Sequence, residues 1–115
     1  MATMKVTGNE LRVRFAAWER PFVWRAKLDV PLTAIRGVQR VDRALRLTRG
    51  GRVGLLISGV MKSGRWGFGA GTRQLVSVRR GVPALRIALS RAETGYDELL
   101  ISVADADRLA EVIRA

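Results

Sequence analysis

Apolar and polar residues alternate at every second position through most of this chain, and the alternation stops only near its end. Residues 11–15 show the pattern first, and residues 85–89 show it most clearly. A period of two puts successive side chains on opposite faces of an extended strand. Turn signals such as Gly50-Gly51 and Gly81-Val82-Pro83 separate the alternating segments. The sequence therefore predicts a mainly β protein, with about seven short antiparallel strands joined by tight turns.

The spacing of apolar residues changes from two to three and four at the C-terminal end. Leu109, Val112 and Ile113 follow this helical spacing, as on the buried face of an amphipathic helix. Asp105 stands just before them, where its carboxylate can accept hydrogen bonds from the first free N–H groups of a helix. We therefore expect one C-terminal helix over about residues 105–114.

Two irregular segments interrupt the strands in the first half of the chain. Residues 18–25 break the alternation, and Pro21 argues against a long helix, so we expect a bend or a single helical turn there. Residues 35–41 return to an extended pattern, but Val38 is out of step with it. A β-bulge near Gly37 would explain that shift.

The bend also carries two tryptophans, Trp18 and Trp24. Exposed indole rings can stack on bases or lie at a membrane interface, whereas a tryptophan in a small β-roll more often fills the core. We expect one of the two to be partly exposed, and the neighbouring Glu19 to lie on the surface.

Glycine positions set the strand boundaries that we expect in the middle of the chain. Residues 45–48 alternate and are expected to form a strand that ends at the Gly50-Gly51 turn. Residues 53–61 are expected to form the next strand, kinked by two glycines. Ser63-Gly64 is then the signal for the following hairpin.

A long central segment carries basic but no acidic side chains. Between Arg43 and Ala92 there is no aspartate or glutamate, and the net charge of the whole chain is +11. Such a field attracts anions, and a cluster of guanidinium groups would hold phosphate, unless the arginines are scattered as a solvated surface. The candidate anion-binding residues are Arg46, Arg65, Arg73, Arg79, Arg80 and Arg86.

Residues 64–73 hold the densest run of glycines in the chain. Their backbone N–H groups could form an anion-binding nest beside Arg65 and Arg73. The alternative is a glycine-kinked hairpin that places Trp66 and Phe68 in the core, and the pattern favours this second interpretation.

The chain has no cysteine and no histidine. Their absence removes thiolate chemistry, the commonest general base and the commonest metal ligand. The acidic residues Glu93, Asp97 and Glu98 are expected either to pair with arginines or to form a negative spot on a basic surface, rather than to catalyse. We therefore expect a protein that is not an enzyme and that uses no metal or cofactor.

No stretch predicts a signal peptide or a membrane span. The N-terminal residues alternate in polarity, and the longest apolar run, residues 53–61, is about half as long as a span. The expected location is the cytoplasm, with a peripheral position at the inner membrane face as the alternative.

Several turn and strand stretches have counterparts in a known family. They are Val30-Pro31-Leu32 with Ile35, then residues 64–72, 75–85 and 96–103, the last leading into residues 106–113. They resemble short, uncharacterised bacterial proteins with the pleckstrin-homology-like (PH-like) fold, a β-roll or barrel closed by a C-terminal helix. The resemblance implies a single PH-like domain over residues 1–115. None of these stretches is a catalytic signature, so the resemblance implies a fold more than an activity.

PH-like domains bind phosphoinositides, peptides or other proteins, so the resemblance implies a noncatalytic binding or scaffold module. With a basic surface, its expected partner is anionic, either phospholipid head groups or an acidic protein segment. The alternative is a small β-barrel that binds nucleic acid, although the sequence has no RNP-like aromatic pair and no helix-turn-helix pattern. Self-association or docking through edge strands is a third possibility. No small-molecule substrate is expected, and the ligand and the oligomeric state stay open.

Overall fold

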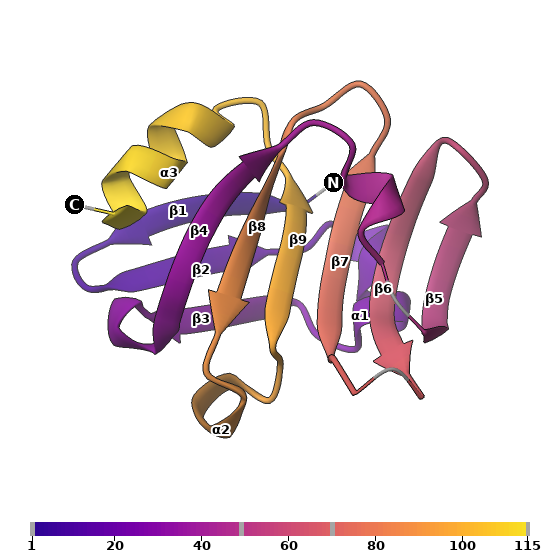
Figure 1. Cartoon of the computed structure of the whole chain (residues 1–115), viewed down its shortest axis with the longest axis horizontal. Helices are drawn as coiled ribbons and strands as arrows, with labels where there is room; N and C mark the ends of the chain where they lie inside the picture. Colours follow the sequence, from indigo (N-terminus) through magenta and orange to yellow (C-terminus); the bar gives the residue numbers. More distant parts are fainter. Residues whose placement is uncertain (1, 49, 70, 115) are drawn as a thin grey trace.

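The chain folds into two layered β-sheets, with a helix at its C-terminal end packed beside them (Figure 1). The computed structural model describes residues 2–48, 50–69 and 71–114. Nine strands lie in these residues, so the prediction of a mainly β protein with a C-terminal helix is confirmed. The predicted number of about seven strands is too low, partly because the N-terminal residues form a strand of their own.

Sheet A has three antiparallel strands in the order β1-β2-β3. Alternation in β2 buries Leu11 and Val13 completely and leaves Arg12 exposed on the opposite face. One face of the sheet is therefore apolar and the other is solvated, as the sequence pattern predicts. The strands are β1 (Thr3–Thr7), β2 (Glu10–Arg14) and β3 (Lys27–Pro31).

Sheet B has six strands in the order β4-β8-β9-β7-β6-β5, so β4 and β5 form its two edges. β7 and β9 run parallel, whereas the other neighbouring strands in the described residues run antiparallel. The strands are β4 (Ile35–Val41), β5 (Gly51–Ile57), β6 (Met61–Phe68), β7 (Gln74–Arg79), β8 (Ala84–Leu89) and β9 (Glu98–Ser102).

Short helices connect the strands, and the longest helix is the C-terminal one. The predicted bend at residues 18–25 is confirmed as η1 followed by α1. The predicted C-terminal helix is confirmed as α3, in which Leu109 and Ile113 are buried but Val112 is 40% exposed. No helix in the described residues is long and apolar enough to cross a membrane. The helices are η1 (Ala17–Glu19), α1 (Arg20–Val23), η2 (Leu32–Ala34), η3 (Ala44–Arg46), α2 (Arg91–Thr94) and α3 (Ala106–Arg114).

Sheet B is covered on both faces around its central strands. Its inner face packs against sheet A and α3, and its fully buried residues there include Leu75, Leu85, Ile87, Leu99 and Ile101. Its outer face carries a smaller cluster of Trp66, Val76, Val78, Ala84 and Leu100, covered by residues 41–47. This double burial explains why the parallel pair β7 and β9 is buried along nearly its whole length.

Two predictions for the middle of the chain are wrong, one for a strand and one for a turn. Residues 44–46 form η3 rather than a strand, because Leu45 and Leu47 pack onto the outer face of sheet B. The chain turns between β5 and β6 at Gly59, whose φ of +72° is a left-handed conformation that glycine adopts easily. The β-bulge predicted near Gly37 is confirmed by a register shift between Ile35 and Gly37.

The predicted hairpin at Ser63-Gly64 is also wrong, since both residues lie inside β6. Gly64 stands opposite Gly54 of β5, and the two backbones approach closely. A Cβ atom on Gly54 would lie 2.5 Å from the Ser63 carbonyl oxygen and 2.7 Å from the Gly64 Cα. These glycines permit close strand pairing rather than a turn.

Candidate anion-binding pocket

The glycine-rich segment at the end of β6 brings Gly67 very close to the backbone of Thr72. Gly67 has a φ of +110°, and a Cβ atom there would lie only 1.6 Å from the Thr72 carbonyl oxygen. Gly69 and Gly71 also have positive φ values, which side-chain-bearing residues rarely adopt. This backbone makes one wall of a pocket of about 580 Å³.

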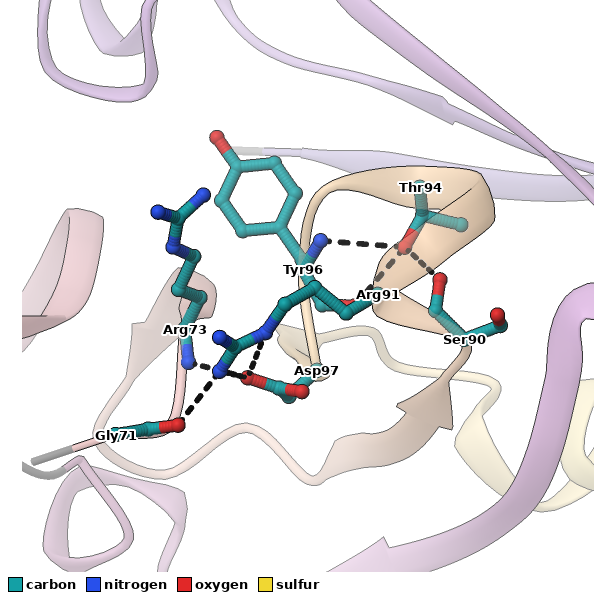
Figure 2. Close-up of polar contacts among 7 residues, drawn as sticks. All are labelled: Gly71, Arg73, Ser90, Arg91, Thr94, Tyr96 and Asp97. Atoms are coloured by element: carbon teal, nitrogen blue, oxygen red, sulfur yellow. Dashed lines mark hydrogen bonds and ion pairs between the residues drawn. The ribbon is translucent and has the colours of Figure 1, made fainter.

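The opposite wall comes from α2 and the residues that follow it. The Thr94 hydroxyl lies 2.8 Å from the Ser90 carbonyl and 2.9 Å from the Tyr96 carbonyl, and it accepts from the Tyr96 N–H at 3.2 Å. Gly95 ends the helix in the left-handed conformation. Figure 2 shows this compact turn presenting the Tyr96 ring beside the Arg73 side chain.

Asp97 ties the two walls together. Its carboxylate accepts from the Arg91 guanidinium, with 2.9 Å to Nε, and from the Arg73 backbone N–H at 2.7 Å. Arg91 also donates to the Gly71 carbonyl at 2.5 Å (Figure 2). The hydrogen bond from Arg91 is the main reason that the pKa of Asp97 lies below its ordinary value, and the same bond raises the pKa of Arg91. Arg91 is therefore a structural arginine of this pocket.

Three further arginines line the same pocket, which we call the arginine pocket. The Arg65 guanidinium carbon lies 3.8 Å from the centroid of the Trp24 ring, and that of Arg25 lies 5.8 Å from the Tyr96 ring. Within the described residues, Arg25, Arg65 and Arg73 have no carboxylate partner for their side chains, and the buried Arg65 Nε has no hydrogen-bond partner. The pocket lining is Arg25, Arg65, Trp66, Gly67, Gly69, Gly71, Arg73, Arg91, Thr94, Gly95 and Tyr96.

The structure brings together only two of the six arginines that the sequence selected. Arg65 and Arg73 line the arginine pocket. Arg86 lies elsewhere, with its Nε 3.1 Å from the buried Glu98 carboxylate, so it neutralises an internal charge. The three others are exposed and lie outside this pocket, and they are Arg46, Arg79 and Arg80.

Arg73 and Arg79 flank β7 at its two ends, roughly 20 Å apart along an extended strand. One small ligand therefore cannot contact both of them. The acid-free block is the segment between Arg43 and Ala92, which carries no acidic residue. Its basic residues are spread over the surface, and only some of them line the arginine pocket.

Sequence reasoning missed two arginines of the pocket, Arg25 and Arg91. Arg25 precedes the acid-free block, in the irregular segment after α1, where basic and acidic residues are mixed in the sequence. Arg91 belongs to the block but lies beside Asp97, and only the folded turn shows how the two interact. The glycine-rich segment was the usable signal, because its two flanking arginines do line the pocket.

Of the two interpretations of residues 64–73, the structure supports parts of both. Trp66 is buried on the outer face of sheet B, as the hairpin interpretation requires, and the side chain of Phe68 lies outside the described residues. The glycines also line a pocket with Arg65 and Arg73, and the anion nest itself stays a prediction.

Glu19 is the polar residue whose position differs most from expectation. Its carboxylate is completely buried and accepts from the Ser63 hydroxyl at 2.8 Å and the Ser77 hydroxyl at 2.5 Å. The expectation that Glu19 lies on the surface is therefore wrong, because the inner face of sheet B supplies two hydroxyl donors for it. Both neighbouring tryptophans are exposed instead, Trp18 at 43% and Trp24 at 71%.

No protein-family model matches this chain, and no match was found among curated proteins or among solved structures. No group of three or more histidine, cysteine, aspartate or glutamate side chains in the described part of the chain is placed to hold a metal ion. The geometry of the arginine pocket is therefore the guide to function.

Proposed function

We propose that this protein is a noncatalytic, PH-like binding module that holds a phosphate-bearing anion in the arginine pocket. The observation that carries the proposal is the convergence of Arg25, Arg65 and Arg73, which have no carboxylate partner in the described residues, on one pocket walled by glycine backbone. The cytoplasm, including the inner face of its membrane, is the location that this proposal implies.

Phosphate fits the chemistry of these side chains. Guanidinium groups donate paired N–H bonds that match the spacing of phosphate oxygens. Three like charges around one hollow also repel one another, and a bound anion would relieve that repulsion. The buried Arg65 Nε has no hydrogen-bond partner in the described part of the chain, so it is a donor that a bound anion would satisfy.

The groups that line the pocket support binding rather than catalysis. Its lining contains no carboxylate, and the Thr94 hydroxyl is already held between two backbone carbonyls. A general base or an activated nucleophile needs a proton acceptor within hydrogen-bond reach. Arginines can bind and orient a phosphate here, but none of them is a proton acceptor.

A titration with glycerol 3-phosphate, followed by NMR of the backbone amides, tests the proposal. We expect shifts in residues 67–73 and 94–97, and a loss of affinity of about tenfold or more in Arg65→Gln or Arg73→Gln. Arg79→Gln is the matched control, because it removes the same charge outside the arginine pocket. If all three variants weaken binding equally, the anion is held by net charge alone and the proposal fails.

Three ligand classes can then be compared on the same protein. Cosedimentation with vesicles of anionic or neutral phospholipid tests for a lipid head group, and a phosphoserine peptide tests for a protein segment. A gel shift with random duplex DNA tests the nucleic-acid alternative. A DNA shift that Arg79→Gln and Arg73→Gln weaken alike would favour that alternative, since backbone contacts to DNA add over a wide surface.

A further inference from the structure

β5 is an edge strand of sheet B, and within the described residues it pairs only with β6. Along such an edge, every second residue directs its backbone N–H and C=O away from the sheet. The strand is seven residues long, which is enough for another extended segment to pair with it. This edge is therefore a possible docking surface, distinct from the arginine pocket but adjoining it at Arg65.

The inner side of this edge is apolar. Val53 and Ile57 are 39% and 45% exposed, far more than the residues of the central strands. Val53 stands opposite Arg65 of β6, and Trp24 stacks on that same arginine. Helix α1 packs against β5 and β6, which brings the exposed Trp24 ring close to the edge. An apolar side chain added beside β5 would find several apolar neighbours here.

The outer side of the same edge carries two cations beside one exposed leucine, Leu56, which stands opposite Lys62. Arg52 stands opposite Trp66, which lies on the outer face, and it has no ion-pair partner in the described residues. Lys62 lies on that face as well and donates to the Leu45 carbonyl at 2.6 Å. Burial is the main cause of the lowered pKa of Lys62, and repulsion from Arg52 adds to it. An acidic side chain beside β5 would be attracted to both cations.

We propose that β5 accepts an extended acidic segment of a partner protein as an additional strand of sheet B. Side chains of a strand alternate between faces, so one set would lie beside Val53 and Ile57 and the other beside Arg52, Leu56 and Lys62. The segment that fits therefore has apolar residues on its inner side and acidic residues where its outer side meets Arg52 and Lys62. Main-chain hydrogen bonds would supply affinity, and this alternation would supply specificity.

Charge and hydrogen bonding distinguish this occupant from two others. A second copy of the chain also carries a net charge of +11, so pairing of two β5 edges would bring like charges together. A lipid bilayer could cover Val53 and Ile57, but it offers no partner for the free N–H and C=O groups between them. An acidic strand satisfies both the charges and the backbone.

A synthetic seven-residue peptide with alternating isoleucine and glutamate tests the proposal on the full chain. Tryptophan fluorescence reports binding, because Trp24 is exposed and lies near the edge. We expect Ile57→Lys to weaken binding by about tenfold or more, since it puts a cation on the apolar side. Gln39→Lys is the matched control, because it adds the same charge to an exposed position of the other edge strand, β4, and should leave the affinity unchanged.

Two altered peptides probe the mode of binding independently of any protein variant. Lysine in place of glutamate should abolish binding, and N-methylation of alternate residues should do the same by removing the strand hydrogen bonds. Equal binding of either altered peptide would overturn the proposal. It would also be overturned if the chain forms dimers that Ile57→Lys dissolves, or binds anionic vesicles in a way that Ile57→Lys prevents.

The site on β5 and the arginine pocket can be separated in one experiment. The acidic peptide should bind with unchanged affinity when glycerol 3-phosphate is present in excess. If glycerol 3-phosphate displaces the peptide, or if Arg73→Gln abolishes its binding, the peptide occupies the arginine pocket and the proposal for β5 is wrong. Failure of phosphate binding alone would leave the peptide result intact.

Discussion

The strands β4 and β5 are the two edges of one sheet, and each is seven residues long. A bulge interrupts the edge at β4, where Arg40 forms ion pairs with Asp42 at 3.0 Å and with Asp107 of α3 at 3.2 Å. Arg114 of α3 also donates to the Val38 carbonyl at 2.9 Å. At β5 the register shifts only near the start of the strand, between Gly51 and Arg52, and no β5 residue forms an ion pair in the described part of the chain. Val53 and Ile57 of this strand are exposed.

The difference between the edges does not come from strand length or from glycine content alone. It comes from the position of α3, which packs against β4 and carries charged residues to it. Bulges, charges and covering helices are the ordinary means of preventing unwanted strand pairing. At β4, α3 and its ion pairs act together, whereas at β5 helix α1 packs against the strand and no ion pair in the described residues involves it. This difference supports β5 as the edge that is open to a partner.

Loosening of α3, the helix that packs against β4, is expected to give the largest change in stability. Leu109 anchors α3 and is 2% exposed, so Leu109→Ala should lower the free energy of unfolding by about 2–5 kcal/mol and expose β4. Urea denaturation measures the loss, and hydrogen exchange at β4 measures the exposure. Val112→Ala is the control, and its effect should stay below about 1 kcal/mol because Val112 is 40% exposed. Equal losses would show that α3 is not what protects β4.

Alanine in place of one glycine on each edge should lower stability at β5 and leave it nearly unchanged at β4. On β5, Gly54→Ala would put a Cβ 2.5 Å from the Ser63 carbonyl oxygen, so we expect a loss of about 1–3 kcal/mol in thermal or urea unfolding. On β4, a Cβ on Gly37 meets nothing within 4 Å, so Gly37→Ala should change stability by no more than about 0.5 kcal/mol. The comparison fails if both variants lose the same stability.

Acid should give the smallest change in stability of the three, and the change should come from Asp97 beside the arginine pocket. The pKa of Asp97 is lowered from 3.8 in the folded chain, chiefly by the hydrogen bond from Arg91. Its stabilisation is therefore fully present above pH 3.8 and is lost as the pH falls through the lower folded value. Thermal unfolding of the wild type and Asp97→Asn should converge in this acidic range.

Local patterns predicted the elements that depend on neighbouring residues. Alternation identified the strand around Leu11 and Val13, and the change of period identified α3. The bulge at Gly37 followed from one residue being out of step. These features are encoded within a few residues, because side-chain direction in a strand or helix has a fixed period.

Contacts between distant segments could not be predicted in this way. Glu19 was expected on the surface because its serine partners, Ser63 and Ser77, lie far along the chain. Arg25 lines the arginine pocket although it lies outside the acid-free block, because folding brings distant segments together there. The turn at Gly59 was misplaced, since several glycines were equally good turn signals and only close strand pairing explains Gly54 and Gly64.

The central position of β9 has a consequence for how the chain is made. A ribosome releases β4 to β8 before β9, yet β9 lies between β8 and β7 and joins the two halves of sheet B. Until residues 98–102 emerge, β8 and β7 each lack a neighbour, and their apolar residues stay open to other chains. Completion of sheet B during synthesis must therefore wait for β9, the last strand in the described residues.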